Sequence, residues 1–180
     1  MRRFYVIAAL AALVAGGCSK QDDTLEETQR TSFTNYLKGQ QYAYTEQSGV
    51  YRYITNTDRE GYGTAPVFDG ESSAVIDFAV YAFSSGSSGK GELYYTNRKD
   101  LIDEESLTDL EHYWPFEPQE ISLSDSRLVK GVRLGLDGCR QGDSVQLFLV
   151  SRLGYGNKPL GLVPANTPLV WDIVVNQVVK

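Results

Sequence analysis

The stretch SVQLFLVSRLGYGNKPLGLVPANTPLVWDIVVNQVV, residues 144–179, decides how this chain folds. Its two ends, residues 144–151 and 169–179, are rich in β-branched and aromatic residues, which is typical of strands. The loop between them, residues 152–168, holds three glycines and three prolines and therefore bends. Tyr155 stands between two of those glycines. An aromatic side chain on such a loop is a candidate binding residue.

Four further segments show strand patterns. Residues 42–56 alternate around a Ser-Gly step and predict a hairpin, and residues 73–83 alternate over SAVIDFAVYAF. Residues 91–97 follow a Gly- and Ser-rich turn and predict the returning strand, and residues 120–123 predict a short one. Strands therefore dominate the chain before its last third.

One helix is predicted late in the chain, within residues 127–139. Apolar residues recur there at helical spacing: Leu128, Val132, Leu136 and Cys139. Each glycine in this segment costs about 1 kcal/mol relative to alanine in a helix. We therefore expect the helix to lie close against another surface. A short helix is also predicted over residues 25–38. Strands followed by one late helix and two more strands indicate an α+β fold.

The N-terminus has the pattern of an export signal. Two arginines precede an apolar run over residues 4–14, which is shorter than the roughly 20 residues that span a bilayer. Three small residues then precede Cys18, an order that resembles the lipobox of bacterial lipoproteins. The resemblance implies a signal peptide over residues 1–17 and a lipid-modified, palmitoylated Cys18 as the mature N-terminus. A plain signal peptide would instead leave Cys18 as a free thiol.

The residues after Cys18 are polar and acidic, and residues 18–30 are predicted to form a solvated tether. The acidic run resembles the surface-export signal of some Gram-negative lipoproteins, but a plain spacer explains it equally well. Residues 31–72 would then be an N-terminal helix and hairpin extension, and residues 73–180 the main domain.

Composition excludes several classes of function. Without residues 1–17, which hold two of the 17 basic residues and none of the acidic ones, 15 basic residues face 23 acidic ones, a formal charge of −8. That balance argues against nucleic acid as a partner. The single histidine, His112, has no neighbouring ligand cluster, so we expect no metal, no other cofactor and no hydrolytic triad. Cys139 has no partner for an intramolecular disulfide.

The chain from Arg127 onward resembles the FKBP family of peptidyl-prolyl isomerases. An apolar pair and a glycine open a short helix, and a Gly-acid turn, a strand, the Tyr-Gly loop and a Val-Pro step follow. Leu169-Val170-Trp171-Asp172 ends the pattern. The resemblance implies an antiparallel sheet wrapped on one short helix.

The same resemblance implies a proline-binding pocket. Tyr155 would be the catalytic residue, donating its hydroxyl to a substrate carbonyl. Leu128 and Val129 would flank the pocket, Val163 would close its loop side with Leu162 beside it, and Trp171 would replace a pocket Phe. The family's tyrosine aligns better with Phe78 than with Tyr81, its Phe-Asp pair falls near Tyr94 and Tyr95, and Val132 replaces a floor Trp.

Two functions remain open from the sequence. The first is a peptidyl-prolyl isomerase in the cell envelope, lipid-anchored to the outer membrane on the periplasmic or surface side. It would act on proline-containing peptides or unfolded exported proteins and bind the family's macrolide ligands. The second is a non-catalytic binding or scaffold module of the same fold. Three departures from the family favour the second function: Val132, Phe78 and the absence of an Asp near Tyr94 and Tyr95. The intact Tyr-Gly loop and Val-Pro step favour the first.

Overall fold

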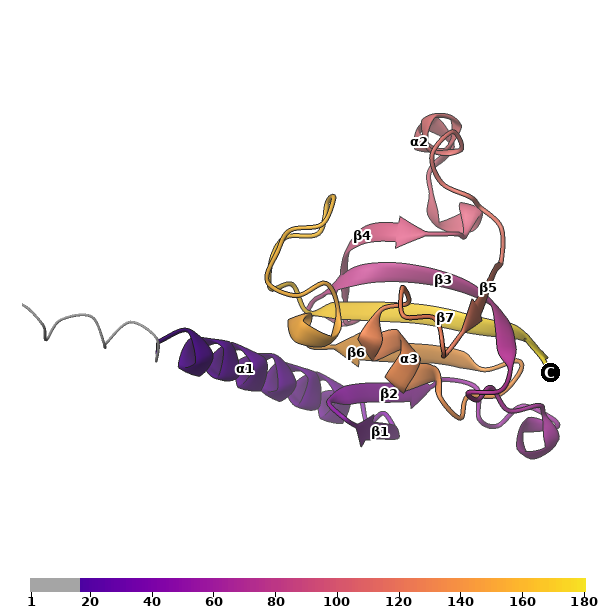
Figure 1. Cartoon of the computed structure of the whole chain (residues 1–180), viewed down its shortest axis with the longest axis horizontal. Coiled ribbons are helices and arrows are strands. Elements are labelled where there is room, and N and C mark those ends of the chain that lie inside the picture. Colours follow the sequence, from indigo (N-terminus) through magenta and orange to yellow (C-terminus); the bar gives the residue numbers. More distant parts are fainter. Residues whose placement is uncertain (1–16) are drawn as a thin grey trace, which may run out of the picture.

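The computed structural model describes residues 17–180 (Figure 1). The predicted signal peptide lies outside the described residues except for Gly17. The elements follow in the order α1 (Gly17–Gly39), β1 (Tyr44–Gln47), β2 (Val50–Ile54), β3 (Ser73–Phe83), β4 (Lys90–Thr96), α2 (Glu104–Leu110), β5 (Gln119–Ser122), α3 (Lys130–Leu136), β6 (Ser144–Leu149) and β7 (Leu169–Val179). The predicted α+β class is confirmed.

The strands form one antiparallel sheet in the order β1-β2-β6-β7-β3-β4, with β5 paired to the first half of β3. The two long strands, β3 and β7, lie side by side at its centre. Their predicted bounds, residues 73–83 and 169–179, are those observed. In the N-terminal hairpin, which was predicted as an extension preceding the main domain, β2 pairs with β6 along its whole length. The hairpin is therefore part of the sheet.

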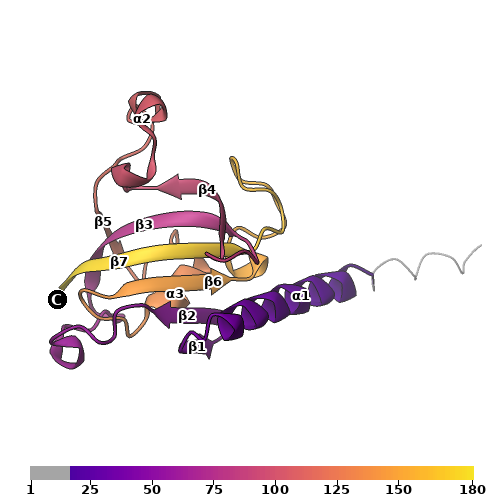
Figure 2. The same ribbon diagram turned by 180° about the vertical axis from the view of Figure 1, so that it is seen from behind.

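Helices cover both faces of the sheet. Successive residues of a strand point to opposite faces, and on β6 they contact different helices. Phe148 packs against Phe33 of α1, with ring centroids 5.9 Å apart, whereas Leu147 lies under Gly135 of α3. Seen from behind, the sheet stands in front of α3 (Figure 2). The predicted site residues Phe78 and Trp171 lie on the α3 face.

The glycines of α3 allow its close approach to the sheet, as their placement predicted. A Cβ atom on Gly131 would lie 2.6 Å from Cδ2 of Leu149, and one on Gly135 would lie 2.7 Å from Cδ1 of Leu147. Both positions exclude any larger residue without a shift of the helix. This contact fixes the distance between α3 and the sheet.

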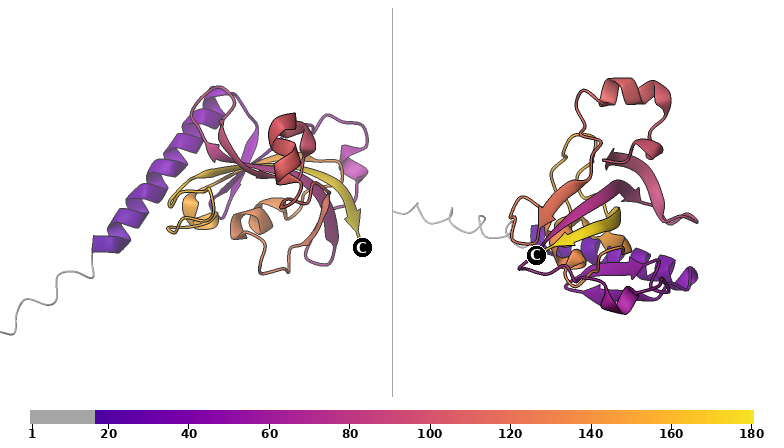
Figure 3. Two further views of the ribbon diagram at one scale, coloured as in Figure 1. Left: turned by 90° about the horizontal axis from the view of Figure 1, so that it is seen from above. Right: turned by 90° about the vertical axis from the view of Figure 1, so that its right-hand side faces the viewer.

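Helix α1 is longer than predicted. The sequence predicted a solvated tether over residues 18–30 and a helix over 25–38, but the helix runs through Gly17–Gly39 and includes Cys18. Its first turns project away from the sheet, and its second half packs on it (Figure 3). Long-range contacts of Glu26 and Gln29 with residues 151–166 stabilise the helix where composition indicated a tether. No helix of the described part, residues 17–180, is long and apolar enough to span a membrane.

Residues 98–118 form an arm that projects from the sheet (Figure 1). It contains the short helix α2. The carboxylate of Asp103 accepts a hydrogen bond from the amide of Ser106 and caps the helix. Both ends of the arm meet at Asn97, which is almost fully buried.

Candidate functional site

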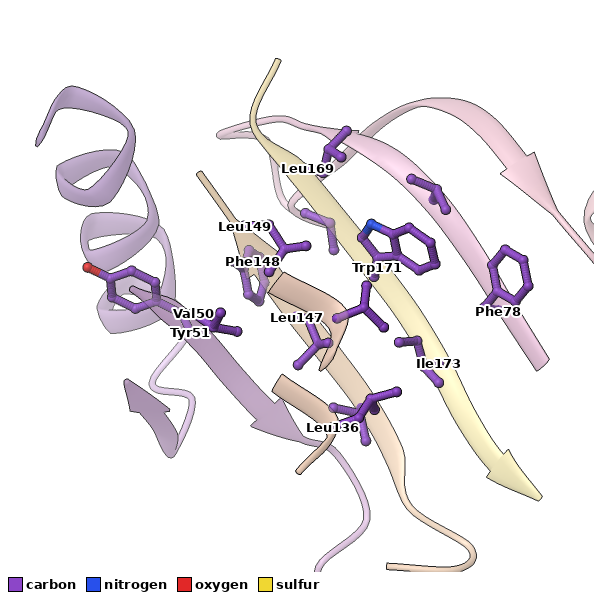
Figure 4. Close-up of a cluster of buried hydrophobic side chains, with 14 of the residues drawn as sticks. Val50, Tyr51, Phe78, Leu136, Leu147, Phe148, Leu149, Leu169, Trp171 and Ile173 are labelled. Atoms are coloured by element: carbon purple, nitrogen blue, oxygen red, sulfur yellow. The ribbon is translucent and has the colours of Figure 1, made fainter. Parts of the chain in front are cut away.

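Three aromatic rings from neighbouring strands form the centre of the candidate site. The rings of Phe78 and Trp171 are stacked, with centroids 5.4 Å apart and planes 26° from parallel, and the ring of Tyr95 lies 5.5 Å from that of Phe78. Figure 4 shows Phe78 and Trp171 beside one another on β3 and β7. Offset aromatic pairs at such distances stabilise one another beyond their buried area. The cluster gives the α3 face a rigid apolar wall.

Asn97 and Thr96 hold the backbone of Phe78 in place. The amide of Phe78 donates to Oδ1 of Asn97 at 2.7 Å, and its carbonyl accepts from Oγ1 of Thr96 at 2.7 Å. Nδ2 of Asn97 donates to the carbonyls of Ile76 and Glu117. One buried side chain thus joins β3, the end of β4 and the end of the arm.

A bulge in β4 decides which tyrosine reaches the cluster. Val80 pairs with Tyr95, but the next pair is Tyr81 with Leu93, so Tyr94 is an extra residue in β4. Tyr94 is buried, and its hydroxyl interacts with Thr167 of the loop between β6 and β7. The sequence alignment assigned Tyr94 to the pocket. The structure instead brings Tyr95 against Phe78.

The arm adds an aromatic residue that the sequence did not assign to the site. The ring of Trp114 lies 4.9 Å from that of Tyr95, nearly perpendicular to it, and Phe116 lies 6.1 Å beyond. Both side chains are half-buried. The sequence showed their aromatic character, but only the fold brings the arm to the cluster.

The N-terminal end of α3 carries the predicted apolar pair. Val129 is the N-cap residue and Leu128 precedes it, and both are half-buried beside the core. Val132, in the first turn, is completely buried. All three positions thus lie at or just before the N-terminal end of α3 and pack with the core.

The loop between β6 and β7, residues 151–168, is called the pocket loop below. Tyr155 is half-buried, and burial, with a smaller contribution from Tyr95, raises the pKa of its hydroxyl to about 12. Gly156, with φ of 80°, adopts the left-handed conformation that turns the chain after it. Val163 is buried, whereas Leu162 is 70% exposed. Tyr155 and Val163 thus face the protein, and Leu162 faces solvent.

Trp171 has an unusual polar atom for such a site. Its Nε1 atom is buried and has no hydrogen-bond partner among the described residues. In Figure 4 the nitrogen lies on the edge of the indole nearest Leu149 and Leu169. A buried N–H without an acceptor is costly, by about 1–3 kcal/mol, and therefore favours a ligand that offers one.

A separate cavity lies outside the aromatic cluster. It measures about 650 Å³ and opens between α1 and the pocket loop, where Glu26, Arg152 and Asn166 are among its lining residues. None of the nine residues predicted for the proline pocket lines it. Charged side chains dominate this cavity, so the aromatic cluster remains the better candidate for an apolar ligand. Within residues 17–180, no group of three or more His, Cys, Asp or Glu side chains could hold a metal ion.

These features define an α+β protein in which an antiparallel sheet, one packed helix and a tyrosine-bearing loop enclose an aromatic cluster. The family of FKBP-type peptidyl-prolyl cis-trans isomerases matches residues 110–176. FK506-binding protein 1A of Neurospora crassa is 32% identical over 57 residues, which cover 31% of this chain and 48% of that protein. The chain thus spans about half the length of this curated relative.

Solved structures show the same fold. A peptidyl-prolyl cis-trans isomerase from Pseudomonas syringae superposes with a TM-score of 0.59 at 17% identity, covering 88% of this chain and 96% of that one. FkpA from Escherichia coli gives a TM-score of 0.57 at 16% identity, covering 91% and 64%. The chain is therefore similar to the FKBP-type family in sequence over residues 110–176 and has an FKBP-like fold.

Proposed function

We propose that this protein is a peptidyl-prolyl cis-trans isomerase that binds proline-containing segments of unfolded exported proteins at the aromatic cluster. The observation that carries the proposal is Tyr155. Its half-buried hydroxyl stays protonated at neutral pH, and it lies on the loop that also supplies Val163. The family match over residues 110–176 supports the same role.

The chemistry requires neither a nucleophile nor a metal. A prolyl peptide bond rotates over a barrier of about 18–20 kcal/mol because twisting breaks the amide resonance. The twisted amide has less charge separation than the planar one, so an apolar site such as that around Phe78 and Trp171 stabilises it relative to water. Tyr155 would hold a neighbouring carbonyl and orient the chain.

Trp171 would add a second donor to this site. The stacking of Phe78 and Trp171 leaves the indole N–H buried and, among the described residues, unpaired. A substrate carbonyl that enters beside the ring would accept this hydrogen bond. The family's usual Phe has no such donor, so we propose that this chain holds its substrate with two donors, Tyr155 and Trp171.

A proline-limited refolding assay with the purified chain tests the proposal. We expect the slow phase, which takes tens of seconds or more without a catalyst, to shorten in proportion to the protein added. A slow phase that is unchanged at every concentration would rule out the enzyme. The family's macrolide ligands should compete with the substrate, and macrolides without effect on an active protein would exclude a shared pocket.

One observation favours the alternative of a non-catalytic binding or scaffold module. Phe78, Val132 and Trp171 are at most 5% exposed, so side chains already fill much of the site. A proline ring can enter only when they move. Titration with proline peptides separates the two functions, because the alternative predicts saturable binding without acceleration of isomerisation.

We also propose a location in the cell envelope, with Cys18 lipidated and inserted in the outer membrane. The support is the sequence pattern before Cys18 and its place in the first turn of α1, at the end that projects from the sheet. Membrane fractionation of a Cys18→Ser variant tests this. The variant should be released into the soluble fraction, and retention equal to the wild type would contradict lipid anchoring.

A further inference from the structure

The side chain of Gln29 joins α1 to both ends of the pocket loop. It is only 5% exposed. Its Oε1 atom accepts a hydrogen bond from the amide of Ser151 at 2.8 Å, and its Nε2 atom donates to the carbonyl of Asn166 at 2.9 Å. Because both polar atoms of this buried amide are paired, its orientation is fixed.

The pocket loop closes this arrangement with its own backbone. The amide of Gly156 donates to the carbonyl of Ser151 at 2.8 Å, and the amide of Asn166 donates to the carbonyl of Gly156 at 2.9 Å. Four hydrogen bonds therefore connect Gln29, Ser151, Gly156 and Asn166 in a closed ring. Tyr155 directly precedes Gly156, so the ring determines where its backbone lies.

Two residues of the ring have left-handed backbone conformations. Gly156 and Asn166 both have positive φ angles, 80° and 61°. Asparagine adopts the left-handed conformation more readily than other residues with a side chain, but the conformation still costs energy that its surroundings can offset. The bond from Gln29 to the carbonyl of Asn166 supplies such a constraint from outside the loop.

Ion pairs hold the same face of α1 on the loop. Arg152 donates to Glu26 through Nε at 2.6 Å, and Arg30 donates to the same carboxylate at 2.7 Å. Arg30 also reaches Glu46 of β1. These pairs flank Gln29 by one helical turn or less, so the helix meets the loop as a rigid surface.

From this geometry we infer that Gln29 is a positioning residue for isomerisation, and that α1 is a working part of the site. The inference rests on the proposed function. By bonding Ser151 and Asn166, Gln29 keeps the pocket loop in the arrangement that directs Tyr155 and Val163 to the substrate. Without these bonds the loop would visit other arrangements, and only the competent fraction would bind substrate.

The first test replaces Gln29 with methionine in the full chain, which keeps the length of the side chain and removes both hydrogen bonds. A fall of the competent fraction to a tenth raises the KM of a prolyl peptide about tenfold. We expect kcat to stay within about twofold of the wild-type value, because substrate binding shifts the loop back to its competent arrangement. Amide hydrogen exchange should become faster at Gly156 and Asn166. An unchanged KM in an active variant would overturn the inference.

A second variant, Gln29→Glu, should have a pH-dependent KM, which destabilisation of the fold alone would not produce. Its carboxylate still accepts from the amide of Ser151 but cannot donate to Asn166. Protonation of this buried carboxyl restores a donor. The KM should therefore be high near about pH 8 and fall toward the wild-type value near about pH 5. Glu26 has a pKa of about 2, and Arg30 and Arg152 stay charged, so the neighbours do not titrate in this range. A KM without pH dependence would contradict the role of the donor.

Phe33→Leu is the matched control for the stability of α1. Phe33 packs on Tyr51, Phe83 and Phe148 and makes none of the bonds of the ring. It should lower the melting temperature yet leave the KM unchanged. A tenfold rise of KM in Phe33→Leu would show that Gln29 acts only through the general stability of the helix.

The exchange measurement separates the failure of this inference from the failure of the proposed function. If the wild-type chain does not accelerate isomerisation, the proposed function is wrong. Exchange at Gly156 and Asn166 then still decides whether Gln29 positions the loop, because faster exchange in Gln29→Met supports it and unchanged exchange overturns it.

Discussion

Trp171 and Phe78 stack on neighbouring strands with ring centroids 5.4 Å apart, and they form the wall of the candidate site. Related sequences are expected to have a Phe at the position of Trp171 and a Trp at the position of Val132. Leu147, on which α3 packs, lies directly opposite Trp171 in the sheet. In this chain, β7 thus supplies the large side chain, Trp171, and α3 supplies the small one, Val132.

Because a small residue at position 132 accompanies a large one at position 171, we predict that substitutions at these two positions are coupled in their effect on the free energy of unfolding. Val132→Trp alone should lower the free energy of unfolding by about 1–3 kcal/mol, because Val132 is completely buried and overpacking strains the core. Trp171→Phe alone leaves a space, which costs stability, but it also removes the buried unpaired N–H, which offsets part of that cost, so the net loss should stay below about 1–2 kcal/mol. The double variant should be more stable than the sum of the two predicts, by more than about 0.5 kcal/mol in denaturant titrations. Additive losses would show that the two side chains fill separate spaces.

Removal of the Tyr155 hydroxyl should affect catalysis more than stability. Tyr155→Phe removes one hydrogen bond to the substrate, so kcat/KM should fall about three- to tenfold in a peptide isomerisation assay. The melting temperature should barely change, because the ring remains. Tyr113→Phe, on a residue that is 82% exposed, is the control and should change neither quantity. A large loss of stability in Tyr155→Phe would show a structural role instead.

The same hydroxyl sets an expectation for pH dependence. Burial raises the pKa of Tyr155 to about 12, so its neutral donor form is favoured in the folded chain and is lost only as pH rises from about 10 toward 12. The wild-type kcat/KM should therefore be level between about pH 7 and about pH 9. A decline across that interval in stably folded protein would contradict the assigned environment of Tyr155.

Asn97 should be important for both the site and the arm. Asn97→Ala leaves the buried amide of Phe78 and the carbonyl of Ile76 without their partners and should destabilise the fold by about 2–4 kcal/mol. The arm should also exchange its amide hydrogens faster, since the bond to Glu117 is lost. Asn176→Ala removes an exposed hydrogen bond to Asp77 and should stay within about 0.5 kcal/mol of the wild type. Similar losses in the two variants would contradict the central role of Asn97.

Acid should loosen the contact between α1 and the pocket loop. The hydrogen bond from Arg152, with Arg30 beside it, lowers the pKa of Glu26 from 4.5 to about 2. A depressed pKa means that the stabilisation is present above about pH 4.5 and is lost as pH falls toward 2. Solvent screening limits it to about 1 kcal/mol. The difference in unfolding free energy between wild type and Glu26→Gln should vanish at low pH, and a constant difference would contradict this assignment.

The sequence predicted the central strands well because their signal is local. Residues 73–83 alternate, residues 169–179 are rich in β-branched residues, and both segments are strands with those bounds. The glycines of α3 predicted its close packing, since only a contact explains them in a helix. The Tyr-Gly loop and the helix before it also indicated the family whose model matches residues 110–176.

The features that sequence reasoning missed depend on distant contacts. Residues 18–30 read as a tether because their composition is polar, yet Gln29 bonds residues more than a hundred positions away. Tyr95 reaches the cluster through a bulge in β4, which the alternation of residues does not reveal. The cap at Asp103, in contrast, left a signal, because an Asp followed by two glutamates is typical of a helix start.

The most direct test of the central claim is the rate of cis–trans exchange in a proline peptide, measured by NMR with catalytic amounts of the full wild-type chain. We predict an exchange rate that rises linearly with protein concentration and is several-fold lower with Tyr155→Phe. An exchange rate equal to that of the free peptide, in a sample that binds the same peptide, would contradict the claim of catalysis.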